Sequence, residues 1–532
     1  MSRTATPRTA APARVPAPAR VARAPLSDAC ATRAAEALPA LVGTGLPVPL
    51  VDGRTVPYAN LDLAASAPAL QAVADHVAEL LPYYSSVHRG AGYASQVCTS
   101  VLEAARGTVA RFVGAREGDV TVFTRNTTDA LNLLAGAVPG ATLCLDVEHH
   151  ATLLAWRGDH RVVGAADTVA ETLDRLREAL AERPTALLAF TGASNVTGEI
   201  PPIAEIVALA HAAGCRVVLD AAQLAPHRRV DIAAWGVDYV VLSGHKLYAP
   251  YGAGALVGRR DWLDVAAPYL AGGGAVRAVG VEGDAAEVSW APAPHRHEAG
   301  TPNVLGAAAL AAACRTLDPV IDTEVPAHER ALVERLTTGL AGIAEVTPLR
   351  IWAETEPAES TIDTETEPAE STIDTRTEPV KSTIDTETEP AEPTVGTDAS
   401  DRVGVCSFTV ADIPAGLVAA ALSAEHGIGV RDGRFCAHPL LARLAGGADA
   451  VRVSLGLGTT ESDVDRLVSA VRAIAEHGPA VDYHEVDGRW APIADTRDLD
   501  PFGLGTTAGG AAGGAAGGAA GGAAGGAAGC GH

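Results

Sequence analysis

Two ionisable side chains follow neighbouring strand-like segments of this 532-residue sequence. Asp220 ends the apolar run Arg216–Asp220, and Lys246 comes shortly after the run Tyr239–Leu242. Both runs are short and apolar without alternation, which is typical of strands buried on both faces of a parallel sheet. Because the carboxyl ends of such strands meet at one edge, the amine and the carboxylate should lie near each other. A lysine can form a Schiff base with an aldehyde, and an aspartate can keep a ring nitrogen protonated. The pair therefore predicts a site for pyridoxal 5'-phosphate.

Lysine is rare in this chain, which supports a chemical role for Lys246. The 40 basic residues include only two lysines, Lys246 and Lys381, and all the others are arginines. An amine can act as a nucleophile or a base, whereas a guanidinium stays charged. Lys381 falls in an acidic repeat, where a solvated lysine needs no chemical role. A surface lysine in a loop is the alternative interpretation of Lys246.

The residues Asn126, Thr127 and Thr128 form a predicted helix start that suits an anion. Asn126 or Thr127 can act as the N-cap, and Thr128 lies in the first turn. Backbone N–H groups and the helix dipole favour a phosphate there. Alone, the pattern is that of an ordinary helix start. Ser243 and His245, beside the lysine, add polar groups that a phosphate can use.

Tandem histidines, His149 and His150, follow the strand-like run Thr142–Asp146. A flat imidazole can stack on a pyridine ring, and a place at the end of a strand favours this role. A buried polar pair with no part in catalysis is the alternative.

The strand-like runs alternate with helical segments. A helix is predicted from Ile203, after Pro201 and Pro202, to about Ala213, because the apolar spacing is helical and Gly214 follows as a terminating residue. The repeated order of strand, helix and strand predicts a mainly parallel sheet in an α/β fold.

Composition excludes several classes of protein. The formal net charge is −24, which excludes a basic nucleic-acid binder. No window holds the 18 or more apolar residues of a membrane span, and the first 25 residues lack the apolar core of a secretory signal, so a cytoplasmic protein is expected. The eight cysteines are scattered without a CxxC motif, which predicts neither a disulfide framework nor a metal site.

Three segments differ in composition from the part expected to fold. An Arg/Pro/Ala-rich arm opens the chain, and a Gly/Ala repeat ends it. Between them, the acidic segment Glu354–Glu392 repeats with a period of 11 residues. None of them has enough large apolar side chains to bury a core, so they are predicted to be disordered. The expected organisation is an arm (1–39), a large cofactor-binding domain (60–315), a small domain (40–59 with 316–350 and 401–480), the acidic insert (351–400) and a tail (481–532).

Many motifs of the chain resemble those of class V, fold-type I pyridoxal-phosphate enzymes. Within them it is most similar to the group II (Suf-type) cysteine desulfurases and selenocysteine lyases. The stretches that carry the resemblance are Leu61–Pro68, Val87–Gly90, Thr124–Thr128, Val147–Ala151, Ser194–Gly198, Asp220–Gln223, Ser243–Tyr248, Glu298–Asn303, Arg431–Cys436 and Arg452–Leu455.

The resemblance implies a large domain with a seven-stranded, mainly parallel sheet, a smaller α+β domain, and a homodimer. It also implies roles for individual residues. Lys246 would form the Schiff base, Asp220 would pair with the pyridine nitrogen, and His149 would stack on the ring. The other cofactor-binding residues would be Thr127, Thr128, Ser243 and His245 at the phosphate, Gln223 and Asn195 near the ring hydroxyl, and Thr301 from the other subunit. Around the substrate, Arg452 would bind the carboxylate, with Asn195, His88 and Arg431 lining the pocket.

Cys436 stands where the resembled desulfurases have a nucleophilic thiol. Such an enzyme takes sulfur from L-cysteine as a persulfide, leaves L-alanine, and passes the sulfur to an acceptor protein. Two arginines and a glycine before Cys436 predict a positive loop that favours the thiolate. However, Arg434 and Phe435 replace two histidines of the familiar pattern. An aminotransferase, an epimerase or a C–S lyase that does not use Cys436 is therefore the alternative. A binding protein without catalysis is a third hypothesis, against which the set of cofactor residues argues.

Overall fold

The structure, a computed structural model, describes residues 38–352 and 401–503. The acidic repeat Glu354–Glu392, the Gly/Ala repeat and nearly all of the predicted arm lie outside the described residues, as does Lys381. Within the described ranges, no helix is long and apolar enough to cross a membrane.

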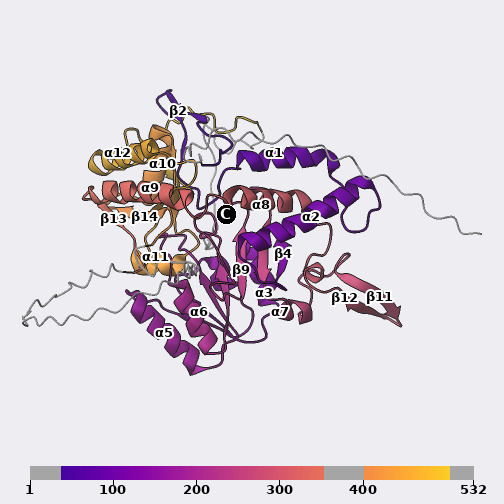
Figure 1. Cartoon of the computed structure of the whole chain (residues 1–532). Coiled ribbons are helices and arrows are strands. Elements are labelled where there is room, and N and C mark those ends of the chain that lie inside the picture. Colours follow the sequence, from indigo (N-terminus) through magenta and orange to yellow (C-terminus); the bar gives the residue numbers. More distant parts are fainter. Residues whose placement is uncertain (1–37, 353–400, 504–532) are drawn as a thin grey trace, which may run out of the picture. The chain divides into compact units, whose positions relative to one another are not determined.

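A seven-stranded sheet forms the framework of the site (Figure 1). Five of its strands pair in parallel, and β10 runs antiparallel to both of its neighbours. The predicted mainly parallel sheet is therefore confirmed. In sheet order the strands are β4 (Val120–Thr124), β10 (Gly254–Gly258), β9 (Tyr239–Ser243), β8 (Arg216–Asp220), β7 (Leu187–Thr191), β5 (Thr142–Leu145) and β6 (His160–Val163).

Helices cover both faces of this sheet, as the unalternating apolar runs predict. In β8, Val217 and Leu219 pack into one core cluster, whereas Val218 points to the opposite cluster. The first cluster includes side chains of α1 (Gln71–Leu80), α2 (Tyr93–Phe112), α5 (Val169–Glu182), α6 (Ile203–Ala212) and α8 (Val304–Leu317). The second includes side chains of α3 (Thr127–Ala135), α4 (His150–Leu154) and α7 (Arg260–Val265).

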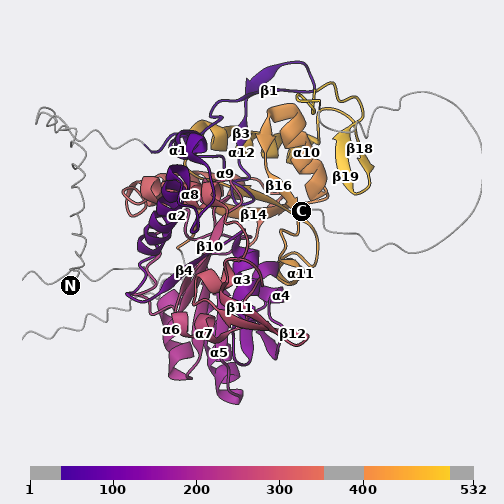
Figure 2. The same ribbon diagram turned by 90° about the vertical axis from the view of Figure 1, so that its right-hand side faces the viewer.

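A second, antiparallel sheet of four strands has its own apolar cluster. Helices from the last part of the chain pack with it, and Figure 2 shows α10 close to β16. Its strands are β13 (Val346–Pro348), β14 (Val405–Val410), β17 (Ala450–Ser454) and β16 (Arg431–Gly433), and its helices are α9 (Glu324–Ala341), α10 (Ala415–His426) and α12 (Glu461–His477). The short helix α11 (His438–Leu444) packs instead into the first cluster, through Leu440 and Leu441. The division into a large and a small domain stays a prediction, because contacts group the described residues, 38–352 and 401–503, as one unit.

Four short two-stranded sheets complete the described part of the chain. They are β1 (Pro47–Pro49) with β2 (Thr55–Pro57), β3 (Ala59–Asn60) with β15 (Ile428–Gly429), β11 (Val276–Glu282) with β12 (Ala285–Trp290), and β18 (Tyr483–Val486) with β19 (Arg489–Pro492). Two 3-10 turns cover Leu81–Tyr83 and His295–His297.

The hairpin β18–β19 falls within the segment that composition assigns to a tail. It packs against α10. Asp487 and Gly488 form its two-residue turn with φ of 50° and 75°. Two adjacent residues of positive φ match the right-handed twist of a hairpin, and Asp-Gly is a favoured pair for this turn. The dipeptide is thus a local signal for the hairpin.

The two chain segments that flank the acidic insert are held by one residue, Glu199. Its carboxylate, only 3% exposed, accepts hydrogen bonds from the backbone N–H groups of Ile351 (2.7 Å) and Trp352 (3.1 Å). Its backbone forms a β-bridge with Arg402. The chain therefore leaves and re-enters the folded part at one place.

We expect deletion of Glu354–Glu392 to leave the fold and cofactor binding intact. Trp352 and Arg402 both contact Glu199, and ten residues, Ala353 and Pro393–Asp401, would remain between them, which is enough to span the gap. A melting temperature within about 2 °C of that of the full chain and an unchanged cofactor absorbance are expected. A deletion variant that expresses only as aggregate would contradict this.

Candidate active site

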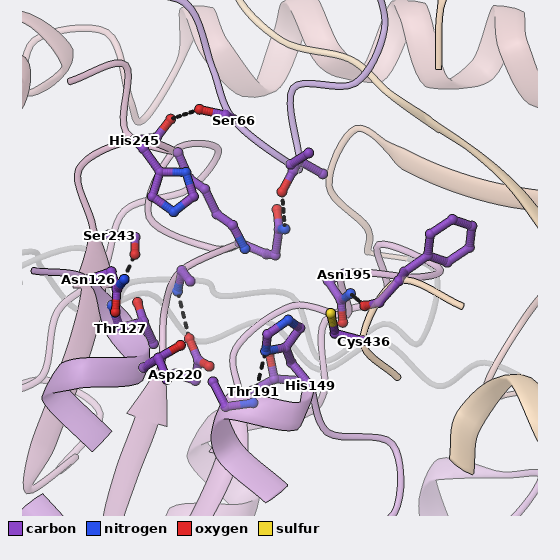
Figure 3. Close-up of a pocket in the computed structure, with 18 of the residues that line it drawn as sticks. Ser66, Asn126, Thr127, His149, Thr191, Asn195, Asp220, Ser243, His245 and Cys436 are labelled. Carbon is purple, nitrogen blue, oxygen red and sulfur yellow. Dashed lines mark hydrogen bonds between the residues drawn. The ribbon is translucent and has the colours of Figure 1, made fainter. Parts of the chain in front are cut away.

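A cavity of about 360 Å³ opens at the carboxyl ends of β7, β8 and β9. Residues from the four-stranded sheet and from the loop before α11 close its other side. Figure 3 shows Asp220, His149, Asn195 and Cys436 meeting in this cavity from different elements. The lining includes the predicted residues Thr127, Thr128, His149, Asn195, Asp220, Gln223, Ser243, His245, Lys246, Arg431, Cys436 and Arg452.

The predicted amine and carboxylate both lie in this cavity. Burial lowers the pKa of Lys246 to about 8, against a partial opposing effect of Asp220. Burial also raises the pKa of Asp220, which the backbone N–H of Ala222 (3.0 Å), the Thr152 hydroxyl (2.8 Å) and the charge of Lys246 oppose. Lys246 therefore reaches its neutral, nucleophilic form at a lower pH than an ordinary lysine does.

His149 is held by its own helix. It is the N-cap of α4, and its Nδ1 accepts a hydrogen bond from the backbone N–H of Ala151 at 3.1 Å. Burial, with the positive charge of Lys246 nearby, lowers its pKa to about 3. The ring is therefore neutral at pH 7 and oriented by the cap, as a stacking residue must be.

A polar cradle forms where α3 begins. Asn126 is the N-cap, with its side chain accepting from the backbone N–H of Asp129 at 3.0 Å. The Ser243 hydroxyl accepts from the backbone N–H of Thr127 at 3.0 Å, which joins this helix start to the end of β9. The buried hydroxyl of Thr127 has no hydrogen-bond partner among the described atoms. An oxyanion at this helix start would supply one.

Arg452 reaches the cavity from β17. It is 4% exposed, donates to Asp62 Oδ1 at 3.0 Å and to the backbone oxygen of Asn195 at 3.1 Å. Its Nε is buried and has no hydrogen-bond partner among the described atoms. A carboxylate ligand can satisfy such a guanidinium with bidentate geometry.

Cys436 differs from the other described cysteines. It is exposed and lines the cavity, whereas Cys98, Cys144, Cys215, Cys314 and Cys406 are buried. Its thiol is close enough to Lys246 and Arg452 to interact with their charges. The remaining cysteines, Cys30 and Cys530, lie outside the described residues.

Two predicted residues lie elsewhere. His88 and Thr301 line a separate cavity of about 550 Å³, together with His295. The His88 ring contacts Glu103 at 3.1 Å and packs edge-on against His295. The structure of a single chain therefore does not bring these two residues to Lys246.

Three residues of the site have no role in the sequence analysis. Thr152 holds Asp220, Asp62 pairs with Arg452, and Phe435 lines the cavity under Arg452. Thr152 and Asp62 are separated from their partners by 68 and 390 residues, so no local spacing points to them. Phe435 could be singled out from the sequence, because it stands where the resembled motif has a histidine.

Comparison with known proteins identifies the family. The model of the aminotransferase class-V family matches residues 59–377 and 388–467. The chain belongs to this family. Curated relatives cover most of the chain. The cysteine desulfurase of Dickeya dadantii is 34% identical over 433 residues, which are 79% of this chain and 92% of the relative. The probable cysteine desulfurase 2 of Mycobacterium leprae is 34% identical over 436 residues, or 78% and 90%.

Solved structures of similar proteins agree with the fold. The apo cysteine desulfurase of Thermococcus onnurineus NA1 has a TM-score of 0.64 and 27% identity, covering 79% of this chain and 95% of its own. The cysteine desulfurase CsdA of Escherichia coli, in an S-sulfonic acid form, has a TM-score of 0.61 and 29% identity with the same coverage. The predicted fold-type I architecture is confirmed.

Pyridoxal phosphate is the cofactor of this family, and the residues present fit it. The partnerless hydroxyl of Thr127 suits a phosphate, and the buried carboxylate of Asp220 suits a protonated ring nitrogen. Asn126, where the resembled motif has glycine, has a φ of −168°. This is extended backbone that any residue adopts, so the substitution leaves the cradle intact.

The pKa of Lys246 predicts how the cofactor-free protein takes up pyridoxal phosphate. Below about pH 8 most of the amine is protonated and cannot attack the aldehyde, so the uptake rate should rise with pH and level off above about pH 9. Stopped-flow absorbance across a pH series measures it. The control is Nα-acetyl-lysine, whose rate should still be rising near pH 10. Parallel profiles for protein and control would refute the prediction.

Thr127→Val removes the partnerless hydroxyl while keeping the shape of the side chain. We expect the dissociation constant for pyridoxal phosphate to rise about tenfold, through loss of one hydrogen bond to a charged group. The melting temperature of the cofactor-free protein should not fall. Thr197→Val is a matched control, since its hydroxyl is also buried without a partner but does not line the cavity. Equal cofactor affinity in both variants would contradict the assignment.

Proposed function

We propose that this chain is a pyridoxal-phosphate-dependent cysteine desulfurase that converts L-cysteine to L-alanine and holds the sulfur as a persulfide on Cys436. The observation that carries the proposal is the exposed thiol of Cys436 in one cavity with Lys246 and Arg452. The cysteine desulfurases among its relatives support the same reaction.

Different residues of the cavity would bind different parts of the cofactor. Thr127, Thr128, Ser243 and His245 would hold the phosphate, with the first of these supplying its free hydroxyl. His149 would stack on the ring. When bound, the cofactor withdraws electrons from the substrate α-carbon, and a protonated ring nitrogen beside Asp220 strengthens this effect.

The reacting groups lie on the other side of the cavity. Arg452 would bind the substrate carboxylate through its unpaired N–H. Lys246 would take the proton from the α-carbon, which its pKa of about 8 suits. The thiolate of Cys436 would attack the substrate sulfur: a sulfur–sulfur bond forms, the carbon–sulfur bond breaks, and the electron pair of that bond stays on the carbon. The proton that Lys246 removed would return to the α-carbon, the proton lost by the Cys436 thiol would reach the β-carbon to complete alanine, and the persulfide would remain.

We also propose a homodimer, in which Thr301 of one subunit binds the cofactor phosphate of the other. Placement of His88 and Thr301 in a cavity away from Lys246 supports this arrangement, because both would then serve the neighbouring site. A cytoplasmic enzyme of the Suf type that passes its persulfide to an acceptor protein completes the proposal.

Cys436→Ala tests the reaction directly. We expect the variant to keep the cofactor absorbance of the parent, since Cys436 contributes no side-chain contact to the cradle, and to lose alanine and persulfide formation by at least about 10³-fold. Alanine is measured by amino-acid analysis and the persulfide by mass spectrometry. Unchanged sulfur release would overturn the proposal. Turnover of another amino acid with none of cysteine would favour an aminotransferase, an epimerase or a C–S lyase.

A further inference from the structure

The loop that carries Cys436 has a strained backbone. Phe435 and Cys436 have φ values of 50° and 53°. Two consecutive left-handed residues other than glycine are unfavourable, by roughly 1 kcal/mol or more each. Such a turn persists only where surrounding contacts hold it, so the contacts of these residues show what keeps the thiol in place.

Phe435 makes a closed set of contacts with Asn195 and Arg452. Its ring is buried, and the guanidinium carbon of Arg452 lies 5.1 Å from the ring centroid. Its backbone oxygen accepts from Nδ2 of Asn195 at 2.8 Å, the bond drawn in Figure 3. Arg452 in turn donates to the backbone oxygen of Asn195 at 3.1 Å. Each of the three residues therefore contacts the other two.

The other side of the turn is attached independently of Phe435. The backbone N–H of His150 donates to the oxygen of Cys436 at 2.8 Å. The backbone N–H of His438 donates to Nε2 of His150 at 3.4 Å, and the two rings meet edge to face. Loss of the Phe435 ring would thus loosen the turn without detaching it.

The ring also supports Arg452. The guanidinium is buried, its pKa is lowered by that burial, and Asp62 is the acidic side chain that it contacts. An aromatic face attracts a weakly hydrated guanidinium and restricts its orientation. The orientation matters because the unpaired Nε must point at the substrate.

We propose that Phe435 is a positioning residue that places two groups at once. Through the turn it sets the position of the Cys436 thiol, and through its ring it sets the orientation of Arg452. The proposal deepens the desulfurase function and rests on it. In this proposal Phe435 couples the position of the nucleophile, Cys436, to that of the carboxylate-binding group, Arg452. Removal of the ring therefore weakens both substrate binding and attack on the substrate sulfur.

The test compares Phe435→Leu, which stays apolar but has no aromatic face, with Phe435→Tyr, which keeps the face. The backbone cost of the left-handed turn is similar for these side chains, because none is glycine or asparagine. Trp262→Leu is the matched control, since it removes an arginine–aromatic contact that does not line the cavity: the guanidinium carbon of Arg216 lies 4.3 Å from the centroid of the Trp262 ring. Phe435→Met is a second ring-free variant should the leucine variant fold poorly.

Two measurements on the cofactor-loaded protein report on the two groups separately. Binding of L-alanine, which has the carboxylate but no sulfur, is titrated through the cofactor absorbance and reports on Arg452. We expect its dissociation constant to rise about tenfold in Phe435→Leu. Alkylation of Cys436 by iodoacetamide, followed by mass spectrometry of its peptide, reports on the thiol. We expect its rate to change about threefold as the thiol leaves its position in the cavity.

Phe435→Tyr and Trp262→Leu should stay within about twofold of the parent in both measurements. A change in only one measurement, or in neither, in the ring-free variants would overturn the proposal. Equal losses in Phe435→Tyr would also overturn it, because the aromatic face would then be irrelevant. Neither measurement uses cysteine turnover. A parent protein that makes no alanine from cysteine would refute the desulfurase function and leave both results interpretable.

Discussion

The cavity holds three charged groups with little access to water, and the cost of burying them shapes most of the site. Lys246, Asp220 and Arg452 belong to different elements, and burial disfavours the charged form of each. A buried charge that lacks a partner costs several kcal/mol, so such groups are stable only inside a network. Thr152 and the backbone N–H of Ala222 serve Asp220, and Asp62 serves Arg452. A bound cofactor and substrate would complete the network, with a phosphate beside the partnerless hydroxyl of Thr127, a cationic ring nitrogen beside Asp220, and a carboxylate beside the partnerless Nε of Arg452.

The need to stabilise buried charges also involves both sheets. Lys246 follows β9 of the parallel sheet, whereas Arg452 lies on β17 of the antiparallel one, and their charges interact across the cavity. The acidic insert lies between β13 and β14, which pair directly through Val346 and Val410. Because the cost of closing a loop grows only with the logarithm of its length, a long insert between paired strands disturbs the sheet little. Glu199 holds the chain on both sides of the insert.

Much of this arrangement could be predicted from sequence because its signals are local. The unalternating runs that become β8 and β9 end in Asp220 and shortly before Lys246, and the rarity of lysine singles out the latter. The cap at Asn126 was one of two alternatives that the sequence left open, and the hydrogen bond from Asp129 decides between them. Contacts between distant residues, such as Asp62 with Arg452, leave no such signal. The hairpin β18–β19 did leave one in its Asp-Gly turn, but composition alone assigns that segment to a tail.

The two residues that precede Cys436, which replace histidines of the resembled motif, point in opposite directions. The side chain of Arg434 faces outward and forms an ion pair of 3.0 Å with Asp449, and both side chains are about half exposed. The side chain of Phe435 faces inward, under Arg452. Neither side chain exchanges protons near neutral pH, unlike the histidines of the resembled motif. In the proposed reaction, proton transfer beside the thiol would then fall to other groups of the cavity. His149 and His245 have pKa values lowered to about 3 and about 4, so both rings are already neutral at pH 7. Lys246, with a pKa near 8, changes charge closest to neutrality. In the proposed reaction, replacement of the histidines would therefore concentrate acid–base chemistry on Lys246, while the proposed role of Phe435 is to position the loop that carries the thiol.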